Sequence, residues 1–328
     1  MRVLVTGATG GLGRNLCEHL MVHNYSVLAT GRNLVIGKSL KDGGINFQPC
    51  DLLNIESLDK LVSGCEVIVH CAALSSAWGK LEDFVQANVV ATENLLAACL
   101  RQKVRRFIYV STASVYFNNN KCFGILETDN IVQPMVNLYA ATKYQAELLV
   151  QVANAKGIET IIIRPRGIFG AYDQNLFPRI LKAAKNGFFP LPNNGSAIID
   201  VTYIENLTYA LRLAIEAEKQ AIGKIYNITN GEPYVVRNLF ETLFDITKQK
   251  VKLIPVPYKI LKGLAITMEQ TNKLLGAGEP KLTCYAVGLL TKSQTFNINA
   301  ARNNLGYIPQ ISVAEGIKRF ATWWRTNS

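Results

Sequence analysis

A tyrosine and a lysine, Tyr139 and Lys143, stand four residues apart near the middle of the chain. On a helix this spacing places both side chains on one face. A free tyrosine has a pKa near 10, so only about 0.1% of it is ionised at neutral pH. A neighbouring ammonium favours the ionised phenol, which can exchange a proton with an alcohol or carbonyl oxygen. The pair alone is common in proteins, so its meaning depends on the segments around it.

Hydroxyl side chains lie upstream of this pair, where an apolar run over residues 106–111 ends. They are Ser111, Thr112 and Ser114. If the run is a strand of a parallel sheet, its carboxyl end faces the crevice where such sheets bind ligands. The tyrosine, the lysine and one hydroxyl therefore form a candidate proton-transfer group.

A glycine-rich turn follows the apolar residues 3–5 and precedes an amphipathic stretch at residues 16–21. Gly7 lets the chain leave a strand sharply, Gly10 leaves room for a phosphate, and Gly13 lets the next helix pack closely. The helix N-terminus adds free N–H groups and a positive dipole end. The G-x-x-G-x-x-G spacing is one residue longer than the dinucleotide fingerprint, and a plain strand–helix turn is the competing interpretation. We predict that a dinucleotide pyrophosphate binds here, against Gly7, Thr9, Gly10, Gly11, Leu12 and Gly13.

A dinucleotide beside the proton-transfer group is typical of nicotinamide-dependent oxidoreduction. A cationic nicotinamide and the lysine ammonium would together lower the pKa of Tyr139 by about 2–3 units. The phenol would then exchange its proton while hydride moves to or from the nicotinamide ring.

The end of the second expected strand, residues 26–30, indicates which dinucleotide binds. Folds that select NAD usually carry an acidic residue there, about 20 residues past the glycines. This chain has Arg32, and the next acidic residue after it is Asp42. A guanidinium makes charge-assisted bonds to a 2′-phosphate, so we predict NADP(H), with NAD(H) use and a solvated loop arginine as the alternatives. Asp51, before Leu52, is placed either to accept from an adenine amino group or to cap the next helix.

Short apolar runs alternate with helical patterns through the first half of the chain. We expect strands at residues 2–6, 26–30, 46–49, 67–71, 106–111 and 160–164, and helices at residues 11–23, 54–63, 81–101 and 138–155. The alternation predicts an α/β fold with a Rossmann-type, doubly wound parallel sheet covered on both faces. Its ligand crevice lies at the carboxyl ends of the strands.

The sequence pattern changes after Arg164, and several prolines and asparagines occur within residues 188–195. We expect a dinucleotide-binding domain over residues 1–170, with returning segments around 197–230, and a smaller mixed α/β substrate-binding lobe over residues 171–328. Further helices are expected near 176–186, 204–217, 235–247, 257–275 and 312–325, and strands near 197–202, 224–228 and 251–254.

Composition bounds the class of protein. The 328 residues are 49% hydrophobic and 18% charged, which is typical of a folded chain with a large core. The net charge of +11 is dispersed, so no nucleic acid is expected; a phosphate-rich cofactor and an acidic substrate suit it, as does a merely solvated surface. Three histidines and seven scattered cysteines show no metal-ligand spacing. We expect a cytoplasmic protein without leader, membrane span or metal, and peripheral membrane contact stays open.

These motifs, in this order, resemble the extended short-chain dehydrogenase/reductase family over essentially the whole chain. In that family the tyrosine is the acid/base, the lysine holds the nicotinamide ribose, and a serine or threonine polarises the substrate oxygen. The resemblance assigns these roles to Tyr139, Lys143 and Thr112. Ser111 and Ser114 are the weaker candidates for the third role.

The resemblance also covers the walls of the cofactor site. Besides the tyrosine and the lysine, it places against the cofactor Cys71, Ala72, Ala73, Ser111, Pro165, Gly167 and Ile168. Asn88 matches a helix asparagine that is mainly structural. The segment 171–173 departs from the Gly-Pro-Gly-Asp of many relatives, so the shape of this loop is open. The resemblance implies a homodimer through the helices at 81–101 and 138–155.

The C-terminal half resembles the 3β-hydroxysteroid dehydrogenase-like branch, and within it the bacterial 2-alkyl-3-oxoalkanoate reductases, at residues 200–206, 226–232 and 278–283. A more widely shared match over residues 299–316 predicts a capped helix pair that closes the lobe. The apolar, helically spaced residues of 257–290 have two open interpretations, plain core or a wall or lid over a hydrophobic substrate that also touches a membrane surface.

We therefore expect an NADPH-dependent oxidoreductase acting on CH–OH or C=O groups. Its substrate is expected to be hydrophobic, with or without a carboxylate, such as a 2-alkyl-3-oxoalkanoate or a 3-keto- or 3β-hydroxysteroid. One alternative is a nucleotide-sugar epimerase or dehydratase, which the apolar segment 257–290 disfavours. Another is a non-catalytic NADP(H) sensor, which Tyr139 disfavours because relatives of that kind typically lack the tyrosine.

Overall fold

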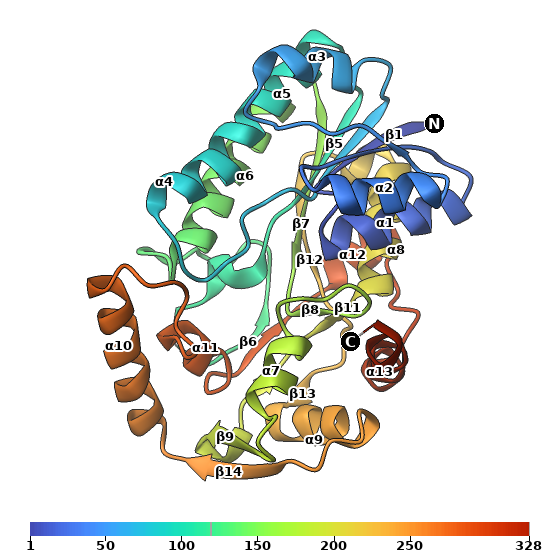
Figure 1. The fold of residues 1–328 in the computed structure, drawn as a ribbon. Coiled ribbons are helices and arrows are strands. Elements are labelled where there is room, and N and C mark those ends of the chain that lie inside the picture. Colours follow the sequence, from blue (N-terminus) through green and yellow to red (C-terminus); the bar gives the residue numbers. More distant parts are fainter. Residues whose placement is uncertain (119, 328) are drawn as a thin grey trace.

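The computed structural model describes residues 1–118 and 120–327. Its centre is a parallel sheet of seven strands in the order β12-β7-β5-β4-β1-β2-β3 (Figure 1). The strands are β1 (Arg2–Thr6), β2 (Ser26–Thr30), β3 (Asn46–Phe47), β4 (Val67–His70), β5 (Arg106–Val110), β7 (Glu159–Pro165) and β12 (Lys224–Ile228). The doubly wound parallel sheet predicted from the sequence is confirmed.

Alternation along each strand buries both faces of this sheet. In β1, Val3 and Val5 enter one apolar core and Leu4 enters the other, as the two-residue period of a strand requires. The first face is covered by α1 (Gly11–Val22), α2 (Leu34–Asp42), α8 (Ile204–Glu216) and α12 (Asn299–Leu305). The second face is covered by α3 (Ile55–Val62), α5 (Ala91–Arg101) and α6 (Leu138–Ala155). A register slip of one residue would exchange the two cores, so the pairing is strongly specified.

The strand order reverses at β1, which has β2 on one side and β4 on the other. The loops after these three strands converge. A Cβ on Gly7 would lie 2.7 Å from the backbone of Ala72, and a Cβ on Gly31 would lie 2.6 Å from the Thr9 hydroxyl. Sheets of this kind open their ligand crevice at such a reversal. The fold therefore gathers the glycine turn and the loops after β2 and β4 around one crevice.

A second region occupies the lower half of Figure 1. It contains the four-stranded sheet β13-β10-β15-β6 and the parallel pairs β8/β11 and β9/β14. Its strands are β6 (Cys122–Ile125), β8 (Ile168–Phe169), β9 (Phe188–Pro192), β10 (Ile198–Ile199), β11 (Thr202–Tyr203), β13 (Tyr234–Val235), β14 (Lys252–Val256) and β15 (Gln294–Phe296). Its helices are α7 (Phe177–Ala183), α9 (Val236–Ile246), α10 (Tyr258–Leu274), α11 (Cys284–Leu289) and α13 (Val313–Asn327). A separate apolar core, in which Phe177, Phe240 and Phe320 are buried, joins α7, α9 and α13.

Two expectations for the first half of the chain need correction. The helix expected over residues 81–101 is divided into α4 (Leu81–Phe84), a π-helical stretch (Val85–Val90) and α5. Helix α2 was not expected; Asn33 accepts two backbone N–H groups at its start, each at 3.0 Å, which is the capping pattern that begins a helix. Among residues 1–118 and 120–327, none of the helices combines the length and apolarity needed to cross a bilayer.

The second half departs from the sequence analysis in two places, because long-range pairing overrides local signals. Residues 188–195, where no strand was expected, contain β9, which pairs in parallel with β14; its prolines are tolerated because β9 has one neighbouring strand. The helices over 299–316 do not close the substrate lobe as a pair. Helix α12 packs against β12 and α8 in the core of the main sheet, and α13 alone joins the second core.

Candidate active site

One large cleft, of about 1670 Å³, is lined by the loops at the carboxyl edge of the main sheet and by the second region. Every residue predicted to touch cofactor or substrate lines it. These residues are Gly7, Thr9, Gly10, Gly11, Leu12, Gly13, Arg32, Asp51, Leu52, Cys71, Ala72, Ala73, Ser111, Thr112, Tyr139, Lys143, Pro165, Gly167 and Ile168. The structure thus brings the predicted site together, and the role of each residue stays a prediction.

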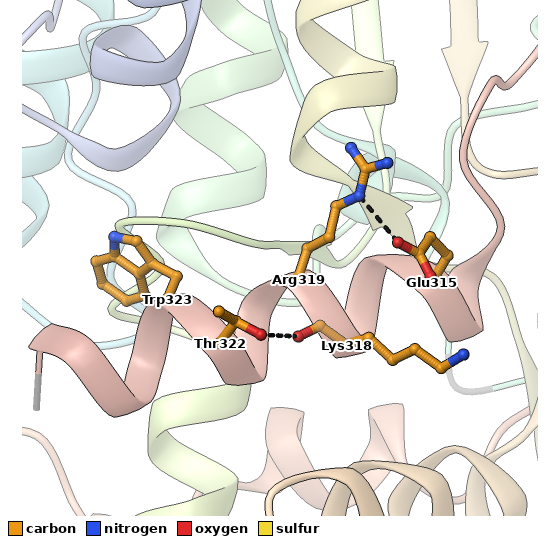
Figure 2. A pocket seen from close by; sticks show the side chains of 5 residues that line it. All are labelled: Glu315, Lys318, Arg319, Thr322 and Trp323. Carbon is orange, nitrogen blue, oxygen red and sulfur yellow. Dashed lines mark hydrogen bonds and ion pairs between the residues drawn. The ribbon is translucent and has the colours of Figure 1, made fainter.

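A smaller hollow, of about 400 Å³, lies on the surface of α13 (Figure 2). Its lining residues are Glu315, Lys318, Arg319, Thr322 and Trp323. Two of its charged side chains already pair along the helix, since Arg319 Nε donates to Glu315 Oε1 at 3.1 Å. The hollow contains none of the residues of the proton-transfer group. The large cleft is therefore the candidate active site.

The glycine turn has the shape that an anion site requires. Gly7 adopts a left-handed backbone conformation, with φ of 64°, and its carbonyl accepts the Gly10 N–H at 2.9 Å. A Cβ on Gly13 would lie 2.3 Å from the same carbonyl oxygen, so α1 packs directly on the turn. No side chain caps α1, and its first N–H groups therefore point toward the crevice with the positive end of the helix dipole.

The loop 171–173, whose shape the sequence leaves open, folds back onto α1. A Cβ on Gly11 would lie 2.6 Å from the Tyr172 carbonyl oxygen. Asn15 donates to the Ala171 carbonyl at 2.9 Å. These contacts close one side of the glycine turn, so a side chain at Gly11 would push the loop away.

Arg32 lies in the loop after β2 and lines the cleft. Its side chain is exposed and forms no hydrogen bond or ion pair with any residue that the structure describes. Neighbouring Asn33, rather than the arginine, holds the start of α2. The guanidinium is therefore available to an anionic ligand.

Asp51 lies on the same rim of the cleft. Its Oδ1 accepts the Leu53 N–H at 3.1 Å, which forms a local turn. The capping alternative is wrong, because the residue at the N-cap of α3 is Asn54. The predicted contact with an adenine amino group stays open to Asp51 Oδ2.

A hydrogen-bond chain through the buried His70 holds the loop after β4. The Ala72 N–H donates to Thr6 Oγ1 at 3.3 Å, and Thr6 Oγ1 lies 2.7 Å from His70 Nδ1. On the other side, His70 Nε2 lies 3.0 Å from Thr92 Oγ1, which donates to the Asn88 carbonyl at 2.7 Å. The hydrogen therefore resides on Nε2, and burial lowers the pKa of His70 to about 3. The histidine stays neutral and positions the predicted cofactor loop.

Asn88 ties this loop to the helix of the proton-transfer group. Its Oδ1 accepts the Leu74 N–H at 2.7 Å, and its Nδ2 donates to Thr142 Oγ1 at 3.0 Å. The residue lies in the π-helical stretch Val85–Val90, a distortion often found at functional sites. These bonds agree with the structural role that the family resemblance implies, since Thr142 adjoins Lys143.

Thr112 is the hydroxyl that meets the tyrosine. It lies just beyond β5, and its side chain acts on the phenol of Tyr139, whose pKa it lowers. Thr112 Oγ1 also donates to Ser114 Oγ at 3.0 Å and accepts the Ser114 N–H at 3.1 Å. Ser111 instead donates to the buried Glu147. The geometry thus favours Thr112 over the two serines for holding the substrate oxygen.

The expected fall in the pKa of Tyr139 depends on a cationic nicotinamide beside the phenol and stays a prediction. In the protein itself, burial raises the pKa of this phenol to about 12; the Thr112 side chain lowers it only in part, and Tyr285 raises it further. Desolvation, which the sequence does not reveal, disfavours the ionised phenol. The protein itself therefore keeps Tyr139 protonated, the state of an acid that donates.

Lys143 lies on the same wall of the cleft and is only 1% exposed. Its Nζ stands 4.1 Å from the centre of the Tyr109 ring. Burial lowers the pKa of the amine to about 7, while the charge of Glu147 opposes this fall. Glu147, fully buried, also accepts a bond from Arg164 Nε at 2.9 Å. The carboxylate therefore links the lysine to a buried ion pair.

Tyr285 is a site residue that the sequence does not reveal. Its hydroxyl lies 2.7 Å from Ser114 Oγ, although the two residues are 171 positions apart. Together with Thr112 this forms a row of hydroxyl groups from Tyr139 to α11. Residues 278–283, which resemble the hydroxysteroid dehydrogenase-like branch, lie just before Tyr285. This resemblance was the only sequence feature that could have drawn attention to Tyr285.

The far part of the cleft is mostly apolar. Helix α10, which stands at one edge of the molecule (Figure 1), contributes Leu261, Leu264 and Met268 to its lining. Of the residues of α10, Leu261 and Ala265 are buried, whereas Ile260 is 61% exposed. Leu261 and Ala265 pack with Val287 of α11 in a small core of their own. The segment therefore contains a small core and also forms an apolar wall of the cleft.

The fold and the site together define an enzyme of the extended short-chain dehydrogenase/reductase class, acting on CH–OH or C=O groups with a nicotinamide dinucleotide. The model of the NAD dependent epimerase/dehydratase family matches residues 3–229. The chain belongs to this family.

Three relatives show the breadth of this likeness. The 2-alkyl-3-oxoalkanoate reductase of Stenotrophomonas maltophilia is 34% identical, over 97% of this chain and 98% of the relative. Isoform 1 of the 3beta-hydroxysteroid-dehydrogenase/decarboxylase of Arabidopsis thaliana is 32% identical, over 96% and 78%. The UDP-glucuronic acid 4-epimerase of Bacillus cereus, solved with UDP-glucuronic acid and NAD, has a TM-score of 0.79 and 25% identity, over 100% of both chains. The resemblance to reductases and hydroxysteroid dehydrogenases is confirmed.

Proposed function

We propose that the protein is an NADPH-dependent reductase of keto groups on hydrophobic substrates, such as a 2-alkyl-3-oxoalkanoate or a 3-ketosteroid, or that it oxidises the matching alcohol. One observation carries the proposal. Tyr139 and Thr112, which acts on the pKa of the phenol, line a single cleft whose far wall is apolar. The likeness to reductases and steroid dehydrogenases over nearly the full chain supports it.

The residues present fit a dinucleotide. The N-terminus of α1 and the side-chain-free turn at Gly7 and Gly13 suit a pyrophosphate, and Lys143 would hold the nicotinamide ribose. When bound, the cofactor supplies or accepts the hydride. Thr112 would hold the substrate oxygen, and Tyr139 would protonate it as the alkoxide forms.

The raised pKa of Tyr139 suits the reductive direction. Protonation of an alkoxide requires the neutral phenol, which is the form present below its pKa. Since burial raises that pKa to about 12, the phenol carries its proton at neutral pH and loses it only as the pH rises toward that value.

We propose that Arg32 selects NADP(H) by binding the 2′-phosphate. Arg32→Ala should weaken NADPH binding by about 10–100-fold, because charge-assisted hydrogen bonds contribute about 1.5–3 kcal/mol. NADH affinity should change little. Fluorescence titration of both dinucleotides measures this, with Arg101→Ala as the control, because Arg101 already pairs with Asp59 at 2.8 Å. Equal losses for both dinucleotides, or no loss, would overturn the assignment.

Tyr285 should support turnover through the hydroxyl row. Tyr285→Phe removes one neutral hydrogen bond and should lower kcat by about 3–10-fold. Ser114→Ala should give a similar loss, and the double variant should lose less than the product of the two, because both belong to one network. Steady-state kinetics measures all three. An unchanged kcat in both single variants would remove Tyr285 from the catalytic account.

A nucleotide-sugar epimerase or dehydratase is the second candidate, because the solved epimerase shares the fold over the whole chain. Such an enzyme keeps its cofactor and needs polar contacts for a sugar diphosphate. Conversion of a UDP-sugar by purified protein that retains oxidised cofactor would favour it. Net consumption of added NADPH with a hydrophobic ketone would favour the reductase.

We also propose that the chain forms a homodimer through α5 and α6 and that it acts in the cytoplasm. On α6, Leu148 and Val152 are 43% and 51% exposed, which gives this helix an apolar outer face. Sedimentation velocity tests the oligomer: twice the chain mass of 36.2 kDa supports a dimer, and a monomer at micromolar concentration contradicts it.

A further inference from the structure

Arg166 is a buried charge at the cleft that neither the cofactor nor the proton-transfer group uses. It follows β7 directly, lines the cleft and is 6% exposed. Its backbone is fixed on both sides by Thr202, whose Oγ1 accepts the Arg166 N–H at 3.3 Å and donates to the Arg166 carbonyl at 2.6 Å. The position of this side chain is therefore determined by the fold and not by a mobile loop.

The guanidinium of Arg166 forms no hydrogen bond or ion pair with any residue in the described part of the chain. The charge of Arg166 lowers the pKa of Asp200. The two side chains are nevertheless too far apart to form an ion pair. Asp200 Oδ2 accepts the Phe296 N–H at 2.7 Å, and its Oδ1 is buried without a partner. The Arg166 nitrogens are open to the cleft, since none of them is a fully enclosed atom without a partner. This cleft therefore contains unused capacity to bind an anion.

A guanidinium binds anions with two suitably spaced oxygens, above all a carboxylate or a phosphate. The position of Arg166 in the cleft decides between these two anions. It lies between Pro165 and Gly167, the segment predicted to face the nicotinamide, and not at the glycine turn where a pyrophosphate fits. The lining of the cleft as a whole is mostly apolar, and Leu261 and Phe240 are among its residues. A carboxylate on a hydrophobic chain satisfies both surroundings.

We propose that Arg166 binds the carboxylate of the substrate, so that the enzyme prefers hydrophobic 3-oxo acids to neutral ketones. The inference rests on the proposed reductase function. In a 3-oxo acid the carboxyl carbon is two bonds from the keto carbon, so both groups must be bound in one cleft. Tyr139 and Thr112 would bind the keto oxygen, and Arg166 the acid. Asp200 opposes the ligand's charge, so it tunes the affinity downward.

The test compares a 2-alkyl-3-oxoalkanoate with its methyl ester, which keeps the keto group and the chains but removes the charge. In Arg166→Gln the acid-to-ester ratio of kcat/KM should fall on the order of 100-fold, and Arg166→Lys should recover part of it, because the charge returns without the two-pronged geometry. Arg179→Gln is the matched control: Arg179 also lines the cleft, but its guanidinium is already bound to Glu279 at 2.7 and 3.0 Å. The control should leave the ratio at the wild-type value.

Asp200→Asn supplies a test with the opposite sign. Asparagine keeps an acceptor for the Phe296 N–H, and loss of the negative charge should raise the acid-to-ester ratio several-fold. This variant also decides the matter if Arg166→Gln fails to fold, which a thermal unfolding scan will show. If Arg166 is only a counter-ion of Asp200, the Arg166 variants will impair acid and ester equally, and Asp200→Asn will not raise the ratio. Either result would overturn the proposal.

A binding measurement separates this inference from the proposed function. Calorimetry of a 2-alkyl-3-hydroxyalkanoate with the Tyr139→Phe protein and NADP⁺ needs no turnover. The same measurement is then made on the double variant that also carries Arg166→Gln. If its affinity for the hydroxy acid is lower on the order of 100-fold, the carboxylate site is supported even if no ketone is reduced. Unchanged binding rejects the carboxylate site even if ketones are reduced.

Discussion

Replacing Tyr139 with phenylalanine should lower kcat by on the order of 10²–10⁴-fold, the range that general acid catalysis contributes. The substitution removes only the phenol oxygen that meets Thr112. The aromatic ring and the lysine remain, so the affinity for NADPH should stay close to the wild-type value. Stopped-flow or steady-state NADPH oxidation measures the first quantity, and fluorescence titration measures the second.

The control for this variant is Tyr258→Phe, a tyrosine on α10 that does not line the cleft. It should keep turnover within a few-fold of the wild type. If Tyr139→Phe also keeps near-normal turnover with a folded protein and intact NADPH binding, then another group delivers the proton and the proposed mechanism is wrong.

Glu147→Ala should be the most destabilising of the substitutions considered, by about 3–5 kcal/mol. Glu147 is fully buried and binds Arg164 through both oxygens, one of them 2.9 Å from Nε, while Ser111 donates to it as well. Its removal leaves the Arg164 guanidinium buried without its counter-ion. The same change should lower the pKa of Lys143 further, because the Glu147 charge is the main group that raises it.

Urea unfolding followed by circular dichroism measures this loss of stability. Glu241→Ala is the control, since Glu241 pairs with Arg237 at 3.0 Å on an exposed helix face, where such pairs contribute about 0.3–0.5 kcal/mol. A cost for Glu147→Ala no larger than the control would mean that water or a rearranged side chain replaces the lost carboxylate, and the buried pair would not be structural.

The parts of the site that are local in sequence could be predicted, because spacing alone determines them. Tyr139 and Lys143 share a face since they are four residues apart on α6, and the glycine turn is a short segment between β1 and α1. The parallel sheet also followed from the order of apolar runs. In each case the physical cause lies within about one strand or helix of the residues concerned.

Arg166, Asp200 and Tyr285 could not be assigned in this way, because their surroundings come from distant segments. Tyr285 reaches Ser114 only through the packing of α11, and Asp200 meets Phe296 across the β10/β15 pairing. The pKa of Tyr139 shows the same limit. The neighbouring Lys143 is visible in the sequence, whereas the burial that raises the pKa of Tyr139 depends on the whole fold.

The most direct measurement of the central claim is a product-resolved assay of the purified protein with NADPH and three substrates: a 2-alkyl-3-oxoalkanoate, a 3-ketosteroid and a UDP-sugar. The account predicts that NADPH is consumed in a one-to-one ratio with the hydroxyl product formed from a hydrophobic ketone, and that the UDP-sugar is recovered unchanged. Conversion of the UDP-sugar without net consumption of NADPH, with both ketones left intact, would contradict it.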